Sequence, residues 1–192
     1  MKEAISAFGS EVFRPLMTLF APGMFALAPW TAGLMQRHPE LYALINENRT
    51  ESSLLLVLTA LTIGMLIEDF GSWVEATKFD ASLDSITNGT HSRNWSNYLK
   101  VAWRVEPVGA RYIRTILLRM KFELGMAGGS LIAAFGVLTL PVALETAALV
   151  FVTLVAFAAI LFHEAKKSHM VLSHTRAGLV EGIMVLGDPP KG

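Results

Sequence analysis

Eight ionisable side chains stand at or near the ends of long apolar segments, where they could form a charged layer at one edge of a membrane. They are Glu68, Asp69, Glu75, Arg119, Lys121, Glu123, His163 and Glu164. A charge at the centre of a bilayer costs about 2.5–3.5 kcal/mol on insertion scales, so such residues normally have a partner or a function. Three interpretations follow: a network of paired charges that fixes helix register, a proton or ion path assembled by oligomerisation, and a metal or lipid-headgroup site.

The histidines and carboxylates do not match a familiar metal motif. Carboxylates combined with imidazole suit divalent cations, but helical di-metal sites usually draw Glu-x-x-His pairs from two helices, and no such pair occurs. Asp80 and Asp84 are four residues apart without the rest of a calcium-binding loop, which predicts an exposed acidic face. The chain has no cysteine, and no phosphate-binding loop or nucleophile motif occurs in it. We therefore predict no metal and no cofactor, and the balance is against an enzyme.

Small residues recur every four positions beside two of the charges. One stripe consists of Ala60 and Gly64 and leads to Glu68, and the other follows Lys121 and consists of Gly125, Gly129 and Ala133. Small side chains let two helices approach each other closely in a membrane. Packing the two stripes together would bring Glu68 and Lys121 to a similar depth, so we expect these two residues to pair.

Four apolar segments are long enough to position these charges. The chain has 192 residues, of which 53% are hydrophobic and 17% charged, and its mean hydropathy is +0.47. About 20 apolar residues in a helix cross the hydrocarbon core of a bilayer. The expected spans are residues 16–35, 53–74, 119–140 and 143–162, which together form a single all-α membrane domain over residues 1–192.

The positions of the basic residues orient these spans, because Lys and Arg gather on the cytoplasmic side of a membrane. Only Arg37 and Arg49 lie in the first loop, and the last hairpin has no basic residue. An arrangement with both termini inside therefore places the other fourteen of the sixteen basic residues in the cytoplasm. We expect four transmembrane helices with N-in/C-in topology in a bacterial inner (plasma) membrane.

The polar segment over residues 76–115 would then be a cytoplasmic loop between the second and third spans, and residues 163–192 a cytoplasmic tail. Near 94–105, aromatic and basic residues recur at helical spacing, which predicts an amphipathic helix at the membrane surface or docked on the bundle. These residues are Trp95, Tyr98, Lys100, Trp103 and Arg104. Their cations are attributed to attraction by anionic lipid headgroups, and no nucleic-acid partner is expected.

These features favour a small homo-oligomeric membrane component, a sensor, effector or scaffold that couples the inner membrane to a cytosolic protein partner through its cytoplasmic face. Small-residue helix faces and the absence of catalytic motifs motivate this hypothesis. Two alternatives stay open. One is a membrane enzyme that acts on lipid headgroups at the inner leaflet. The other is an ion-conducting channel, which only the charged layer supports.

Overall fold

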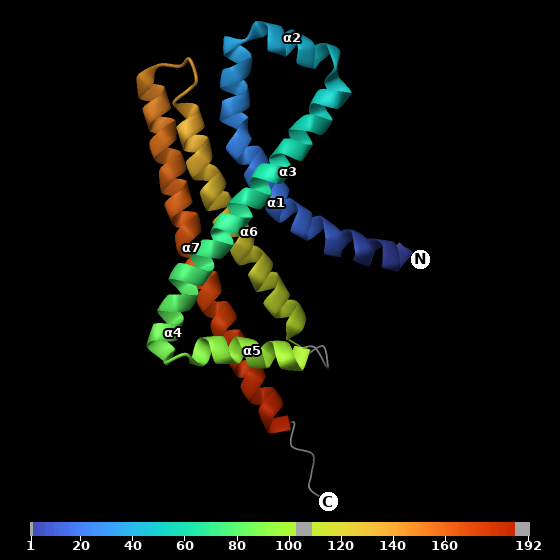
Figure 1. Ribbon diagram of the computed structural model, residues 1–192, viewed down its shortest axis with the longest axis vertical. Coiled ribbons are helices and arrows are strands. Elements are labelled where there is room, and N and C mark those ends of the chain that lie inside the picture. The colour runs from blue at the N-terminus through green and yellow to red at the C-terminus, as the bar shows by residue number, and fades with distance from the viewer. Residues whose placement is uncertain (1, 103–108, 187–192) are drawn as a thin grey trace, which may run out of the picture. The chain divides into compact units, whose positions relative to one another are not determined.

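The computed structural model describes the backbone of residues 2–102 and 109–186, and the side chains within 16–99 and 111–181. Every element in these ranges is helical (Figure 1). The α-helices are α1 (Lys2–Arg37), α2 (Pro39–Glu47), α3 (Arg49–Val74), α4 (Ala81–Thr87), α5 (Thr90–Ala102), α6 (Ala110–Val137) and α7 (Leu144–Leu186), and a π-helix, η1 (Glu75–Asp80), joins α3 to α4. The all-helical prediction is confirmed for this part of the chain.

The helices divide into two compact units. The apolar unit comprises Met1–Gly71 and Lys121–His163, and the polar unit comprises Ser72–Met120 and Glu164–Gly192. Three long helices, α3, α6 and α7, contribute one segment to each unit. The apolar unit holds most of the predicted spans, and the polar unit holds most of the predicted loop and tail.

Three helical stretches in the described ranges are long and apolar enough to cross a membrane: Leu16–Arg37, Arg49–Thr87 and Leu144–Glu181. They contain the first, second and fourth predicted spans. The third predicted span, in α6, is not among them. Charged side chains continue in α6 as far as Glu123 and the helix ends at Val137, so only fourteen uncharged helical residues remain, and a full crossing needs about 20.

In the apolar unit, α1 crosses α3 at a contact made by two glycines (Figure 1). A Cβ atom on Gly23 of α1 would overlap the backbone carbonyl of Ala60, and a Cβ on Gly64 of α3 would overlap the backbone carbonyl of Leu19. Ala60 itself is completely buried. Only glycine permits this approach of the two backbones, which is the role expected of small residues between membrane helices.

The second small-residue stripe also packs against α1. Pro22 is fully buried, and its ring and carbonyl group lie where a Cβ on Gly125 or Gly129 of α6 would stand. The spacing in the sequence had suggested that the two stripes could pack on each other, but both contact α1 around this proline. Helices α3 and α6 meet further along, where Ile67 lies against Gly128 and Leu124 lies against Gly71.

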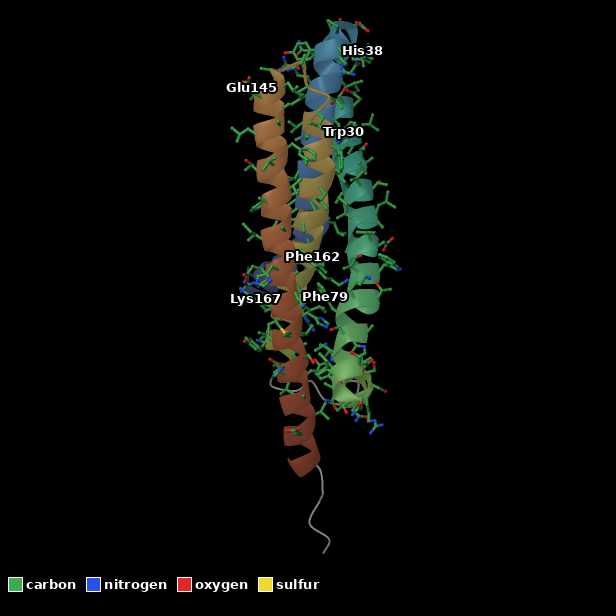
Figure 2. All side chains as sticks on the ribbon, turned by 90° about the vertical axis from the view of Figure 1, so that its left-hand side faces the viewer. Trp30, His38, Phe79, Glu145, Phe162 and Lys167 are labelled. Atoms are coloured by element: carbon green, nitrogen blue, oxygen red, sulfur yellow. The ribbon has the colours of Figure 1, made fainter. Side chains whose placement is uncertain are left out.

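The same unit leaves one face of α7 uncovered. Between the labelled Glu145 and Phe162, side chains project outward along this helix (Figure 2). Leu149, Val152 and Ile160 are 69%, 63% and 60% exposed. An apolar helix surface of this extent is typical of contact with lipid or with another membrane helix.

In the polar unit, a tight turn connects α4 to α5. Asn88 ends α4 in the left-handed region with φ of 52°, and Gly89 follows with φ of 76°; these two residue types adopt that region most readily. The Asp84 carboxylate then accepts a hydrogen bond from the backbone N–H of Ser92 at 3.0 Å and another from the Ser92 hydroxyl. Asp84 thus caps the first turn of α5, where unpaired backbone N–H groups favour an anion.

Candidate functional site

The predicted charged layer contains one ion pair that the stripes anticipated. Lys121 donates a hydrogen bond to the Glu68 carboxylate, and both side chains lie in the apolar unit at 30% and 28% exposure. Glu123 is buried in the same unit, whereas Asp69 and His163 are exposed. The pairing of Glu68 with Lys121 fits the interpretation of this layer as a device that fixes helix register.

The remaining members of the layer, Glu75, Arg119 and Glu164, belong to the polar unit. Arg119 is exposed. Glu164 accepts a hydrogen bond from Lys167, one turn further along α7, at 2.7 Å. Glu75 instead faces a different group of side chains, which is described below.

The predicted amphipathic helix corresponds to α5, and its described aromatic residues contact other side chains of the polar unit. The rings of Trp95 and Tyr98 are stacked with centroids 5.9 Å apart, and Tyr98 is buried. The guanidinium carbon of Arg176, on α7, lies 4.2 Å from the centre of the Trp95 ring. These contacts are those of a helix docked on the protein. The Lys100 side chain and the predicted residues Trp103 and Arg104 lie outside the described residues.

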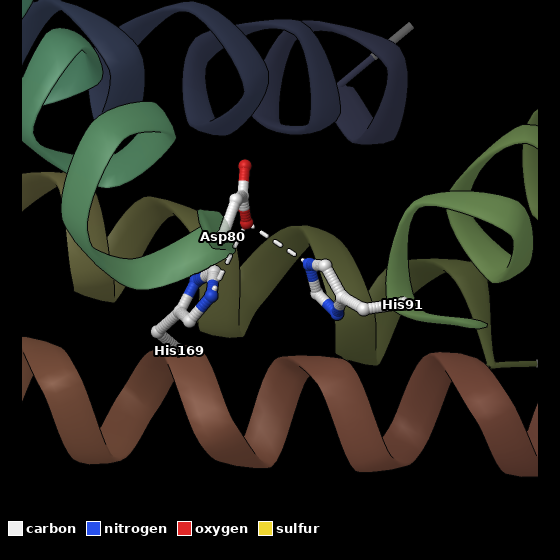
Figure 3. Close-up of side chains that lie close together, drawn as sticks. All are labelled: Asp80, His91 and His169. Atoms are coloured by element: carbon white, nitrogen blue, oxygen red, sulfur yellow. Dashed lines mark hydrogen bonds and ion pairs between the residues drawn. The ribbon is translucent and has the colours of Figure 1, made fainter. Parts of the chain in front are cut away.

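Three side chains from three separate elements converge in the polar unit (Figure 3). Asp80 is the last residue of η1, His91 lies in the first turn of α5, and His169 lies on α7. The Asp80 Oδ1 atom is 2.9 Å from His91 Nε2 and 3.3 Å from His169 Nε2. One potential ligand atom from each residue lies within 4.8 Å of the others.

The π-helical form of η1 sets the position of the acidic side chains. Hydrogen bonds in a π-helix run from i to i+5, so residues five apart come to the same side, and such segments are frequent at functional sites. Glu75 and Asp80 are the first and last residues of η1 and both face His169. Glu75 Oε1 lies 4.0 Å from His169 Nδ1, opposite to the Asp80 contact on the same ring.

Both histidines are buried, but their hydrogen bonding differs. His91 is 6% exposed. Its Nδ1 atom lies 2.8 Å from the hydroxyl oxygen of Ser173, and its Nε2 atom bonds to Asp80. His169 is 1% exposed, yet neither ring nitrogen makes a hydrogen bond of acceptable geometry. A buried polar group without a partner loses the hydration it had in the unfolded chain, so it calls for an explanation such as a bound ion.

The charges around the two rings reinforce each other. Although partial burial opposes it, contacts with His169 and His91 hold the pKa of the Asp80 carboxyl below its usual range. Burial lowers the pKa of the Arg176 guanidinium, and the charges of Asp80 and Glu75 oppose that shift. A guanidinium nevertheless stays protonated in proteins. The described side chains that act on one another here include the carboxylates of Asp80 and Glu75, the two imidazoles and the Arg176 guanidinium.

The donor set and its spacing fit a divalent transition-metal ion. Ligand atoms held tetrahedrally at about 2.1 Å from a zinc ion are about 3.4 Å apart. The two distances from Asp80 are 2.9 and 3.3 Å, and all three ligand atoms lie within 4.8 Å of one another. Two imidazoles and a carboxylate suit zinc, iron or manganese. In such a site both histidines would bind through Nε2. Ser173 would then accept the Nδ1 hydrogen of His91, and Glu75 is placed to do the same for His169; such second partners orient metal-binding histidines.

From the sequence, Asp80 was predicted only to be part of an exposed acidic face, and the histidines matched no familiar metal motif. The structure brings Asp80, which is 38% exposed at its side chain, against two buried histidines. The three residues follow no spacing rule because each comes from a different helix. Of the acidic residues near this site, the sequence had singled out only Glu75, as a member of the charged layer and with no partner predicted for it.

Comparisons of this chain with protein-family models, with curated proteins and with solved structures found no match. The function therefore has to be inferred from the geometry of the polar unit and from the apolar helices.

Proposed function

We propose that this protein is an integral membrane component that binds a divalent transition-metal ion in its polar unit and signals metal occupancy to a cytosolic partner, as a sensor or effector. The observation that carries the proposal is the convergence of Asp80, His91 and His169 from three helices, with both imidazoles buried. The buried ring nitrogens of His169 make no hydrogen bond and have only the ion-pair contacts with Asp80 and Glu75, so a metal ion would give this ring the bonded partner that it lacks.

The proposed membrane topology has four spans with both termini in the cytoplasm, in a bacterial inner membrane. The distribution of basic residues supports this orientation, and it places the polar unit in the cytoplasm. The third span would be α6, which packs against Pro22 of α1, with Lys121 and Glu123 near the cytoplasmic headgroup level. The exposed apolar face of α7 would contact lipid or a second copy of the chain, and a homo-oligomer is part of the proposal.

A metal ion would strengthen the connections within the polar unit because its ligands come from three different elements. Binding would tie η1, α5 and the C-terminal part of α7 to one another through the three ligands. A ligand that binds one conformation more tightly than another shifts the population toward it. The ordered form of the polar unit would then be the surface that a cytosolic partner recognises.

Metal binding is tested with the full chain in detergent, stripped with a chelator and then titrated with Zn²⁺, Mn²⁺ or Fe²⁺. Bound metal is measured by elemental analysis after desalting. We expect one ion per chain, and at least a tenfold weaker affinity in His91→Ala and His169→Ala. His174→Ala is the matched control, because His174 is an exposed histidine five residues further along the same helix.

Two results would overturn the metal site: a wild-type chain that takes up no ion, or a His174→Ala chain that loses metal to the same extent as His169→Ala. The partner is sought separately, by affinity purification from native membranes with and without chelator. A metal-independent set of co-purifying proteins, or none, would argue against a metal-dependent signal while leaving the metal site itself standing.

A further inference from the structure

A second buried group in the polar unit has a donor atom without a hydrogen bond. Arg176 is 5% exposed, and its Nε atom is buried without a hydrogen bond. No ion pair within 4 Å joins Arg176 to a carboxylate among the described side chains, although Asp80 and Glu75 act on it electrostatically. Taking a guanidinium out of water without a close counter-charge is costly. A bound anion would remove that cost.

We propose that Arg176 and the metal ion together bind an oxyanion of the phosphate type, so that the metal centre works on or senses a phosphate group. This inference rests on the proposed metal site. Three protein ligands would leave one coordination position of a four-coordinate metal ion open. We assign a ligand with the chemistry of phosphate to that position.

The spacing of residues on two helices places Arg176 on the side of the metal ligands. His169 and Arg176 are seven residues apart on α7, and His91 and Trp95 are four apart on α5, so each pair shares one helix face. The contacts agree with this spacing. The rings of His91 and His169 lie 5.6 Å apart, and Arg176 lies over Trp95.

Trp95 leaves the hydrogen-bond donors of Arg176 available. The guanidinium carbon lies over the Trp95 ring, 4.2 Å from the ring centre, and this contact is made to the ring and not to an acceptor atom. The five N–H donors of a guanidinium point outward in its plane, and two of them together match two oxygens of a phosphate or carboxylate. An aromatic ring in contact with the guanidinium holds it in place without using its N–H donors.

The charge balance of the unit also favours an anion once metal is bound. Without metal, the carboxylates of Asp80 and Glu75 exceed the single charge of Arg176. A divalent ion reverses the balance and leaves one net positive charge, with the imidazoles neutral as metal ligands. Among the described residues, the other titratable groups that face this region are Tyr98, His91, His169 and Asp84. The Asp84 carboxylate is engaged by its hydrogen bonds from Ser92 and is left out of this balance. An oxyanion that contacts both the metal and Arg176 would neutralise the excess.

The same phosphate chemistry has two sources, the headgroup of an anionic phospholipid and free phosphate. We therefore measure the binding of inorganic phosphate to the metal-loaded full chain in detergent by calorimetry. The measurement is repeated in nanodiscs of phosphatidylglycerol and in nanodiscs of phosphatidylcholine. If the lipid headgroup occupies the site, phosphatidylglycerol weakens the binding of free phosphate; if free phosphate is the ligand, the two nanodiscs give equal affinities.

The decisive variants are Arg176→Gln and Arg176→Lys, with Arg93→Gln as the control, because Arg93 is an exposed arginine on α5. We expect Arg176→Gln to retain metal and to bind phosphate at least tenfold more weakly. Arg176→Lys keeps the positive charge but lacks the paired N–H donors of a guanidinium. Its affinity for phosphate should therefore lie between that of the wild type and that of Arg176→Gln. Arg93→Gln should match the wild type. Removing the metal should also weaken phosphate binding at least tenfold.

Unchanged phosphate affinity in metal-loaded Arg176→Gln would overturn the oxyanion site. If Arg176→Gln does not fold, the comparison is made with Arg176→Lys, and wild-type affinity in that variant would overturn the site in the same way. Failure of the metal site is seen separately, as absent metal uptake by the wild type. In that case phosphate is titrated into the metal-free chain. Phosphate binding by the wild type that is lost in Arg176→Gln supports an anion site at Arg176. Absence of phosphate binding by the wild type overturns that site.

Discussion

The Nε2 atom of His169 lies 3.3 Å from the Oδ1 atom of Asp80, although 89 positions separate the two residues in the chain (Figure 3). The π-helix that ends at Asp80 turns this carboxylate toward α7, and His91 approaches the same oxygen from α5. One oxygen atom thus links three helical elements. The link depends on charge and protonation, so it should respond to metal and to substitution in measurable ways.

Metal should stabilise the polar unit against heat. A ligand present at 100 times its dissociation constant stabilises the native state by about 2.7 kcal/mol, which for a chain of this size corresponds to a rise in Tm of about 5–10 °C. We expect Zn²⁺ to raise the Tm of the wild type and a chelator to reverse the rise. The shift should vanish in His169→Ala and persist in His174→Ala. A zinc-induced shift that survives in His169→Ala would contradict the site.

The pair of Glu68 and Lys121 should behave as a coupled unit. Removing one partner leaves the other charge partly buried, so Lys121→Met alone should destabilise the chain by about 1–3 kcal/mol, a range reduced here because both groups are about 30% exposed. The double variant Glu68→Gln/Lys121→Met should lose less than the sum of the single variants. Unfolding in mild detergent measures this cycle. Strict additivity would show that the pair has no energetic coupling.

The crossing of α1 and α3 should tolerate no side chain at its glycines. Gly64→Ala places a Cβ against the carbonyl of Leu19, so we expect lower thermal stability and lower yield in membranes. The matched control is Gly178→Ala on α7, because a Cβ there meets no atom within 4 Å. Alanine favours an exposed helix over glycine by about 1 kcal/mol, so the control should be neutral or slightly stabilising.

The cap of α5 should weaken in acid. Hydrogen bonds from the side chain and the backbone of Ser92 lower the pKa of Asp84. A carboxyl whose pKa is lower in the folded chain contributes its full stabilisation above its unfolded pKa and loses it as the pH falls through the folded value. Protection of the first α5 amides from hydrogen exchange should therefore persist to below about pH 4 and then decline. Asp84→Ala should show weak protection at every pH. An unchanged exchange profile in this variant would argue against the cap.

Part of the charged layer in the apolar unit was predictable because it depends on local pattern. The i, i+4 spacing of Ala60, Gly64 and Glu68 indicated a packed helix face that ends in a charge, and a helix periodicity alone carries that information. The same spacing after Lys121 indicated its partner, and the two residues do pair. The choice of α1 as the helix that receives both stripes was not predictable, because glycine permits close approach without specifying which neighbour approaches.

Taken alone, the amino-acid sequence determined that the chain is helical, that several of its helices are long and apolar enough to cross a membrane, and that charges collect where those stretches end. These properties follow from composition and periodicity, which act over a few turns of one helix. Only the tertiary structure decided that Asp80, His91 and His169 share one site, and that Arg176 lies over Trp95. These contacts join residues on separate elements, and no local preference encodes which element will lie beside which. A π-helical turn at residues 75–80, rather than any motif, is what directs the carboxylates toward the histidines.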